Sequence, residues 1–349
     1  MKKILVLLLA LVLTATLAAS FVGCSETHVE NITVYVPDGG PALGMAYLMK
    51  DVKAIDGVTI KYEIVKGAQE IAAAVTNGDA DVAIMPTNLA AKLYNAGKEI
   101  VLVGTNSHGL LYLLSDQENF ALNDLKGKVL HLVGQAGTPE AVVKKVLDAN
   151  SIAYEESDAP VDGKVALKFY ADGSQVIQGL VSGSIHYAIL GEPAVSTALQ
   201  KAAAKNVQIV ADLQALWATA TGSDASYPQT ALVVKKSLIK TDEKLVQKIA
   251  EQTVVNKVKL SRSATSYLAY LRDEMGATQV PATLTAEGVL RVNLDPTFGA
   301  AAKTEIEAYL NVLLAFDKTL IGGKLPDSGF YYDDNGALTS YKEMVDDFE

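Results

Sequence analysis

The chain has 349 residues, 50% of them hydrophobic, and a formal net charge of −10 at pH 7. This acidic balance disfavours nucleic acid or anionic lipid as a partner. At about 150 residues per domain, the length predicts two domains.

The N-terminus has the order of a secretory signal. Lys2 and Lys3 precede an apolar stretch from Ile4 to Ala19, and small residues follow it before Cys24. The apolar stretch is short for a membrane-spanning helix, which needs about 20 residues, and no later stretch is long and apolar enough to span a bilayer.

Cys24 is the only cysteine of the chain, which excludes an internal disulfide and a multi-cysteine metal site. Residues 21–24, Phe-Val-Gly-Cys, resemble a bacterial lipobox, although Phe21 stands where leucine is usual. The resemblance implies a signal peptide over residues 1–23, a lipid on Cys24 and a linker over 24–31. The alternative is a plain signal peptide cut near Ala19, which leaves a free thiol.

Strand and helix patterns alternate after the linker. Strands are expected at 32–36, 58–65, 81–85, 100–103 and 128–133, and helices at 42–52, 69–76, 89–95 and 141–149. This alternation predicts βαβ units and a mainly parallel sheet.

Two segments of the chain match at an offset of 105 residues. Residues 69–85 and 174–190 each read as a helix, a glycine stop and a buried strand that leads into a proline-containing loop. The glycines, Gly78 and Gly183, occupy a position where positive φ is favourable. We therefore predict two similar α/β lobes. From about Thr241 on, apolar residues keep helical spacing, and we expect these helices to form a cap on the first lobe.

Ligands of open parallel sheets bind beyond the carboxyl ends of the strands, where helices begin. Five loops have this position: 38–41, 85–88, 134–140, 171–174 and 191–193. Pro41, Pro139 and Pro193 suit first helical positions, and Thr138 and Ser174 suit helix caps. Glycines in such loops have a second explanation, because tight turns between a strand and a helix need glycine whatever the loop binds.

The charged residues of these loops limit which ligands are expected. Arginine occurs only at Arg262, Arg272 and Arg291, all in the C-terminal helical part, so no guanidinium clamp for a sulfonate is expected. The loops carry four acids: Asp38, Glu140, Asp172 and Glu192. They favour a neutral or cationic ligand over a strong anion. Alternatively, Glu140 and Glu192 only stabilise the helix ends at which they lie.

Several other side chains are candidates for the ligand cleft. Tyr35, Trp217 and Tyr227 could stack on a flat ring, although core packing explains Trp217 better. His108 is a candidate for the hinge or the cleft wall. A catalytic function has little support, because the chain has no P-loop and its histidines show no metal-ligand spacing. We expect no enzyme activity, no cofactor and no metal.

Four segments together resemble the ABC-transporter substrate-binding family for nitrate, sulfonates, taurine and thiamine pyrimidine precursors. They are residues 32–47, 72–94, 124–128 and 191–193. The resemblance implies a type II periplasmic-binding-protein fold: two α/β lobes, each a mainly parallel sheet flanked by helices, with the ligand cleft between them. It implies a small-molecule solute and the permease of an importer as partners. We expect a monomer that is extracytoplasmic and lipid-anchored to the bacterial cell membrane.

The resemblance also nominates ligand-binding positions. They are Gly39, Gly40, Pro41, Ala42, Pro86, Thr87, Asn88, Gly137, Thr138, Pro139, Asp172, Gly191 and Glu192. Two further candidates are Asp38 in the first loop and His108, which lies where we expect the chain to leave the first lobe. The candidate loops contain no arginine or lysine, and in this they differ from the sulfonate-binding and nitrate-binding members of the family. We expect lobe I to comprise residues 32–108 and 229–349, and lobe II residues 109–228. Two alternatives stay open: a thiamine-pyrimidine-forming enzyme of a related branch, whose cysteine-rich motif is missing here, and a lipoprotein that only docks a partner protein.

Overall fold

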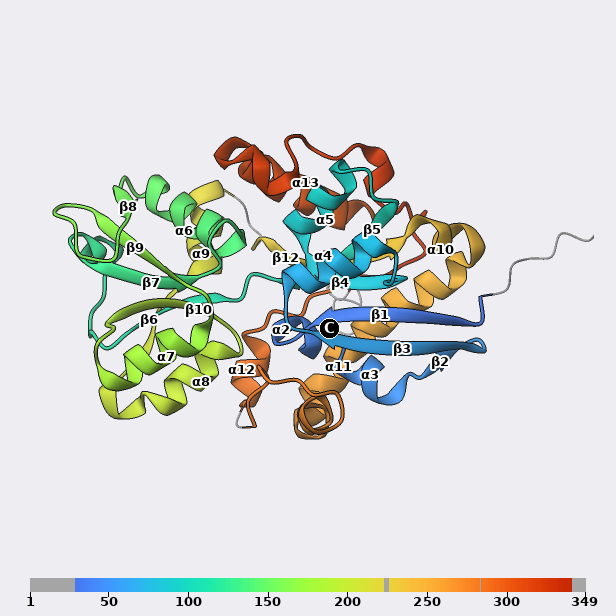
Figure 1. Ribbon diagram of the computed structural model, residues 1–349, viewed down its shortest axis with the longest axis horizontal. Helices are drawn as coiled ribbons and strands as arrows, with labels where there is room; N and C mark the ends of the chain where they lie inside the picture. Colours follow the sequence, from blue (N-terminus) through green and yellow to red (C-terminus); the bar gives the residue numbers. More distant parts are fainter. Residues whose placement is uncertain (1–28, 223–225, 283, 341–349) are drawn as a thin grey trace, which may run out of the picture.

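The computed structural model describes residues 29–222, 226–282 and 284–340 (Figure 1). The predicted signal peptide and the predicted lipid attachment at Cys24 lie outside the described residues. Within these ranges, no helix has both the length and the apolar character needed to cross a membrane.

The first of two six-stranded sheets contains strands from both ends of the chain (Figure 1). Its order is β2-β3-β1-β4-β12-β5. The strands are β1 (Asn31–Pro37), β2 (Ala54–Ile55), β3 (Val58–Val65), β4 (Val82–Pro86), β5 (Ile100–His108) and β12 (Pro228–Lys235). β3, β1 and β4 are parallel, whereas β12 runs antiparallel between β4 and β5. We call this sheet with its helices lobe I.

The second sheet has the order β11-β6-β10-β7-β9-β8. Its strands are β6 (Leu111–Ser115), β7 (Val129–Val133), β8 (Tyr154–Glu156), β9 (Val165–Tyr170), β10 (Tyr187–Gly191) and β11 (Gln208–Asp212). β10, β7, β9 and β8 are parallel, and β6 is antiparallel to both of its neighbours. We call this sheet with its helices lobe II.

The two sheets share one topology. Each lobe has its first parallel strand (β1 or β7) between the second (β3 or β9) and the third (β4 or β10). Next to the third strand lies a strand contributed by a crossover, β12 in lobe I and β6 in lobe II. The edge strand beside it is β5 in lobe I and β11 in lobe II. The predicted α/β class with two similar lobes is confirmed.

The internal repeat is also confirmed. Helix α4 (Ala68–Asn77) ends at Gly78 with φ 83°, and helix α7 (Gly173–Ser182) ends at Gly183 with φ 77°. β4 and β10 follow at the same offset. A left-handed residue at this position closes the helix end, and glycine adopts it without the steric cost of a Cβ atom.

The helix expected over 42–52 is instead two short helices, α2 (Gly40–Leu43) and α3 (Ala46–Asp51). The break falls at Gly44, whose carbonyl accepts a hydrogen bond from Asn106 Nδ2 at 3.4 Å. A Cβ atom at Gly44 would overlap the Asn106 side chain. The tight approach of β5 therefore interrupts a segment whose sequence favours one helix.

The remaining helices cover both sheets. They are α5 (Thr87–Asn95), α6 (Thr138–Ala149), α8 (Ala194–Lys201), α9 (Leu213–Thr221), α10 (Lys236–Thr241), α11 (Glu243–Asp273), α12 (Ala286–Leu290) and α13 (Gly299–Phe316), with short 3₁₀ turns at η1 (Leu122–Leu125), η2 (Ala203–Lys205), η3 (Lys318–Ile321) and η4 (Ser328–Phe330). α11 packs on α3, and α13 packs on β5 and η3.

The C-terminal helices pack on lobe I, as expected from the sequence, and they also contact lobe II. α13 also packs on α6 of lobe II, and Gly288 in α12 lies so close to Ser196 of α8 that a Cβ atom would clash with its hydroxyl. The expected packing on lobe I is present, and the contacts with lobe II were not foreseen because spacing along a helix gives its apolar face but not the number of partners that share it. The C-terminal part bridges the two lobes.

Candidate functional site between the lobes

The β1–α2 loop of lobe I lies directly against the β10–α8 loop of lobe II. A Cβ atom at Gly40 would come 3.4 Å from the carbonyl oxygen of Glu192, and one at Gly39 would come 3.8 Å from Pro193. Gly39 also has φ 95°, a conformation that favours glycine. Two of the loops nominated from the sequence are thus in contact, and both use glycine for a close approach.

A buried ion pair joins the lobes at this contact. Arg291 Nε donates to Glu192 Oε1 at 2.6 Å, and the side chains are 14% and 0% exposed. Arg291 Nη2 also donates to Ser196 Oγ at 3.1 Å, and the Ser196 backbone N–H donates to Glu192 Oε2. Burial raises the pKa of Glu192, and the hydrogen bond and charge of Arg291 oppose this rise.

The position of Arg291 corrects the charge argument made from the sequence. Arg291 follows α12 in the C-terminal part, yet the fold returns it to the β10–α8 loop. A guanidinium group is therefore present at the cleft, and it is occupied by Glu192. Glu192 does not act as an uncompensated negative charge, so it gives no preference for a cationic ligand.

A second contact between the lobes lies at the start of α6. The Thr138 hydroxyl lies 2.8 Å from Tyr309 Oη of α13 and donates to Asn88 Oδ1 of α5 at 3.4 Å. Asn88 Nδ2 in turn donates to the Leu320 carbonyl at 3.4 Å. Thr138 does not cap α6, because Gly137 holds the N-cap position. Its hydroxyl instead joins the two lobes.

Two aromatic rings, Trp217 and Tyr227, pack with Tyr309 in a cluster of three. Trp217 of α9 lies edge-on to Tyr227 and Tyr309, with ring centroids 5.4 and 5.9 Å apart, and the two tyrosine rings stack at 6.1 Å. All three are buried. Trp217 belongs to lobe II, Tyr309 to lobe I, and Tyr227 to the segment between them. The aromatic cluster therefore spans the boundary between the lobes, where the sequence suggested packing for Trp217.

The other acids of the predicted loops also have partners within the protein. Asp38 Oδ2 accepts the backbone N–H groups of Thr278 at 2.7 Å and Gln279 at 3.0 Å. Glu140 accepts the Ala136 N–H at 2.6 Å and pairs with Lys144. These carboxylates hold loops in place. For Glu140 this agrees with the alternative that it stabilises the helix end at which it lies.

Asp172 lies outside both contacts between the lobes. It caps α7 by accepting the backbone N–H of Ser174 at 2.8 Å, so the cap predicted for Ser174 is provided by Asp172. These hydrogen bonds lower its pKa. Among the remaining nominated residues, Pro41 and Pro139 occupy first turns of α2 and α6, Ala42 is buried in lobe I, and Pro86 ends β4. Gly191 lies against Leu110 of the first crossover.

His108 lies at the end of β5, where the first crossover begins. Its Nε2 lies 3.0 Å from Glu305 Oε2 of α13, and its backbone N–H donates to the Asn293 carbonyl at 2.9 Å. It is opposite Pro228, the first residue of the returning strand β12. This position between both crossovers fits the hinge role that the sequence suggested as one of two alternatives.

Gln214 was not nominated from the sequence, although it connects both crossovers. Its Oε1 accepts the Leu111 N–H at 3.0 Å and the Tyr227 hydroxyl at 3.1 Å. Within the described ranges, its Nε2 and the hydroxyl of Thr87 are buried without a hydrogen-bond partner. Buried polar groups are rarely left unpaired, so both are candidates for contact with a solute or with water.

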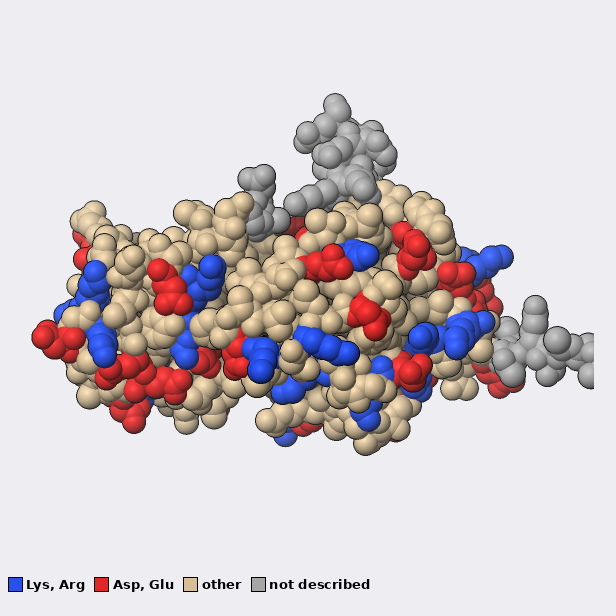
Figure 2. Space-filling view, turned by 90° about the horizontal axis from the view of Figure 1, so that it is seen from above, with Lys and Arg blue, Asp and Glu red and all other residues tan. Residues whose placement is uncertain are grey.

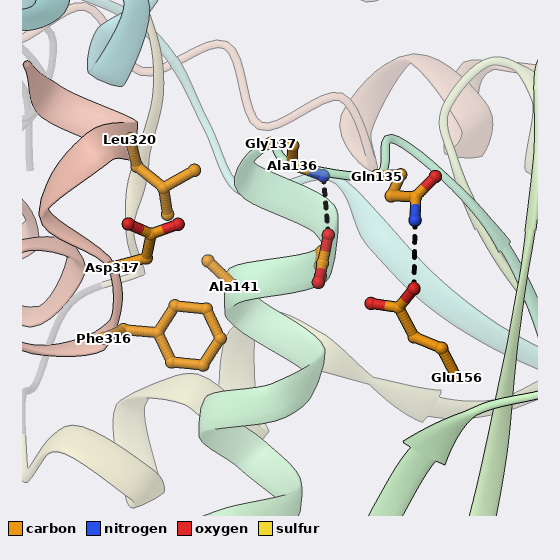
Figure 3. A pocket seen from close by; sticks show the side chains of 9 residues that line it. Gln135, Ala136, Gly137, Ala141, Glu156, Phe316, Asp317 and Leu320 are labelled. Carbon is orange, nitrogen blue, oxygen red and sulfur yellow. Dashed lines mark hydrogen bonds between the residues drawn. The ribbon is translucent and has the colours of Figure 1, made fainter.

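A pocket of about 220 Å³ opens beside the second contact between the lobes (Figure 3). The start of α6 lines one side with Gly137 and Ala141, and Phe316, Asp317 and Leu320 of lobe I face it. Gln135 and Glu156, which are joined by a hydrogen bond of 3.1 Å, lie on the far side of α6. The pocket shares Gly137 with the residues nominated from the sequence.

No protein-family model and no curated protein matches the chain. Solved structures do match it, and the likeness shows its fold, which is shared with periplasmic sulphonate-binding and nitrate-binding proteins.

Three of these structures illustrate the match. An ABC transporter protein from Parabacteroides distasonis is 23% identical, with a TM-score of 0.74 over 87% of this chain and 99% of that chain. The periplasmic aliphatic sulphonate binding protein SsuA from Escherichia coli is 13% identical, with a TM-score of 0.64 over 88% and 93%. The periplasmic nitrate-binding protein NrtA from Synechocystis PCC 6803 is 11% identical, with a TM-score of 0.58 over 86% and 83%.

Proposed function

We propose that this protein is an extracytoplasmic solute-binding protein that delivers a small organic molecule to the permease of an ABC importer. The observation that carries the proposal is that loops from equivalent positions of two like lobes meet at one boundary. Residues 109–228 would move as one body against the rest of the chain, with the crossovers near His108 and Tyr227 as the hinge. A solute favours the closed arrangement only by its higher affinity for that state.

The proposed solute is neutral or cationic and has a flat apolar part. The cluster of Trp217, Tyr227 and Tyr309 offers aromatic surface when the lobes separate, and Thr87, Asn88 and Thr138 offer polar groups beside it. Arg291 is neutralised by Glu192, so it gives no net attraction for an anion. The acidic side chains of Glu156 and Asp317 at the pocket further disfavour one.

The single tryptophan of the chain provides a direct test of solute binding. Because Trp217 lies between the lobes, its fluorescence should change when a solute changes their separation. We expect residues 25–349 to show saturable changes with one class of heterocycle or amine, together with a rise in melting temperature. A solute at 100 times its Kd should add about 2.7 kcal/mol of stability.

The same solute panel separates the alternatives. A solute that is bound and recovered unchanged supports a solute-binding function, whereas conversion of the solute to a product would show that the protein is an enzyme. A panel without any response in fluorescence or melting temperature would contradict solute capture and favour docking of a partner protein. A response only to sulfonates or nitrate would overturn the proposed ligand class but not capture itself.

The proposed membrane attachment depends on Cys24. We expect the full chain to fractionate with membranes and Cys24→Ser to be released or to stay unprocessed, because serine cannot carry the thioether-linked lipid. Labelling with a radioactive fatty acid measures the modification directly. Equal labelling of both proteins would rule out Cys24 as the attachment site, and the solute-binding proposal does not depend on this result.

A further inference from the structure

A group of lysines and tyrosines forms one surface on lobe I, away from the contacts between the lobes. Lys50 Nζ lies 5.1 Å from the centre of the Tyr267 ring, Lys53 Nζ 5.0 Å from that of Tyr270, and Lys259 Nζ 5.9 Å from that of Tyr47. The rings of Tyr47 and Tyr267 meet edge to face at 6.3 Å. We call these six residues the α3–α11 surface, after the helices on or beside which they lie.

The positive charge of the α3–α11 surface is largely uncompensated. Within the described parts of the chain, no carboxylate forms an ion pair with Lys50, Lys53 or Lys259. The nearest acid by sequence is Asp51, which accepts a hydrogen bond from the Tyr267 hydroxyl at 3.1 Å. Three cations on a protein of net charge −10 would each gain from a carboxylate nearby. Lys53 Nζ donates to the Tyr270 hydroxyl at 2.7 Å and to the Met49 carbonyl, and neither acceptor carries a negative charge. The charge of the three lysines is therefore available to an external anionic partner.

The place of this surface in the fold points to the membrane as that partner. The Lys53 carbonyl accepts the Ile60 N–H, and Ile60 is the partner of Ile32 in β1. Neighbouring strands are about 4.8 Å apart, so Lys53 lies about 10 Å from the first residues of β1. Figure 1 shows β2 and the start of β1 at the same end of lobe I, and α3 leads into β2 there. The chain from Cys24 to Asn31 reaches at most about 25 Å, so an anchor there would keep this surface near the bilayer.

We propose that the α3–α11 surface binds the headgroups of anionic phospholipids. Lysine ammonium groups attract such headgroups, and the partly exposed rings of Tyr47 and Tyr270 suit the membrane–water interface, where one end of the ring is apolar and the other polar. The Tyr267 ring is buried and contributes only its contact with Lys50. The net charge of −10 argued against anionic lipid when taken for the whole chain. At physiological salt, however, charges more than about 8 Å away are largely screened. Acidic and basic side chains are interspersed elsewhere, as on the face in Figure 2.

The inference uses the proposed anchor for its geometry, but its test does not need the anchor. Residues 25–349 are mixed with vesicles of phosphatidylcholine alone or with a large fraction of phosphatidylglycerol, and binding is measured by sedimentation. We expect binding to the anionic vesicles at low salt and its loss at 0.5 M salt. Each lysine near an anionic surface contributes roughly fivefold, so Lys50→Gln/Lys53→Gln/Lys259→Gln should bind about a hundredfold more weakly.

A matched control removes the same charge from lobe II. Lys126, Lys128 and Lys201 are exposed, and replacing them with glutamine should change binding less than twofold. Both triple variants are first compared by melting temperature, and single variants replace any triple variant that is less stable. The proposal is overturned if wild-type protein ignores the anionic vesicles, if it binds both vesicles equally, or if both triple variants lose binding alike. It is likewise overturned if the α3–α11 variant keeps vesicle binding but impairs stimulation of a permease, which would assign the surface to a protein partner.

Discussion

Replacing Arg291 with methionine is expected to lower the free energy of unfolding by about 3 kcal/mol near neutral pH. Methionine fills a similar volume but leaves the Glu192 carboxylate, which is 0% exposed, without its counter-ion. Breaking a buried ion pair by removing one partner costs about 3–5 kcal/mol. The lower end is expected here because separation of the lobes would let water reach Glu192. Chemical unfolding followed by circular dichroism measures the loss.

The loss should depend on pH with a definite sign. Burial raises the pKa of Glu192 above its ordinary value of 4.5, and without Arg291 it rises further. A carboxyl group whose pKa is higher in the folded state than in the unfolded state stabilises the fold below the unfolded pKa, and this stabilisation disappears as pH rises through the folded pKa. Arg291→Met should therefore be less destabilised at pH 5 than at pH 8.

Two further variants make the argument specific. Glu192→Gln combined with Arg291→Met should recover part of the lost stability at pH 8, because a neutral amide is less costly to bury than an unpaired carboxylate. Arg262→Met removes an exposed arginine and should change stability by less than about 0.5 kcal/mol. Equal losses for Arg291→Met at pH 5 and pH 8 would contradict a charged Glu192 as the cause.

Local sequence patterns were sufficient to predict the α/β class and the internal repeat. The alternation of buried and exposed residues in β3 and the glycines after α4 and α7 are determined by neighbours within a few positions. The short edge strand β8 and the strands β6 and β11 were missed as separate elements. Their places depend on pairing with residues far along the chain, which periodicity alone does not reveal.

For the candidate site, too, sequence patterns did not reveal contacts between residues far apart in the chain. Rules on strand ends and helix starts led to Gly39, Gly40, Thr138 and Glu192, which do lie at the boundary between the lobes. Arg291 was expected elsewhere because it is 99 positions from Glu192. Tyr309 and Gln214 look like ordinary helix residues in sequence. What makes them part of the site is the bridging of the two lobes by the C-terminal helices and by α9, which follows only from the three-dimensional arrangement.

Replacing Trp217 with alanine is expected to have the largest effect on stability, a loss of about 3–5 kcal/mol. The side chain is 3% exposed and packs on both Tyr227 and Tyr309, so truncation leaves a cavity that neither lobe alone can close. Trp217→Phe retains an aromatic ring and should lose less. Urea unfolding followed by circular dichroism is the measurement, because the only tryptophan is gone.

The control for Trp217 is an apolar side chain outside the core. Leu290 at the end of α12 is 65% exposed, and Leu290→Ala should change stability by less than about 0.5 kcal/mol. If Trp217 holds the lobes together, its loss should also increase the radius of gyration in small-angle scattering before unfolding begins. A Trp217→Ala protein with unchanged stability and unchanged radius would show that the aromatic cluster does not join the lobes, and the boundary would then depend on the Arg291–Glu192 pair and the Thr138 contacts.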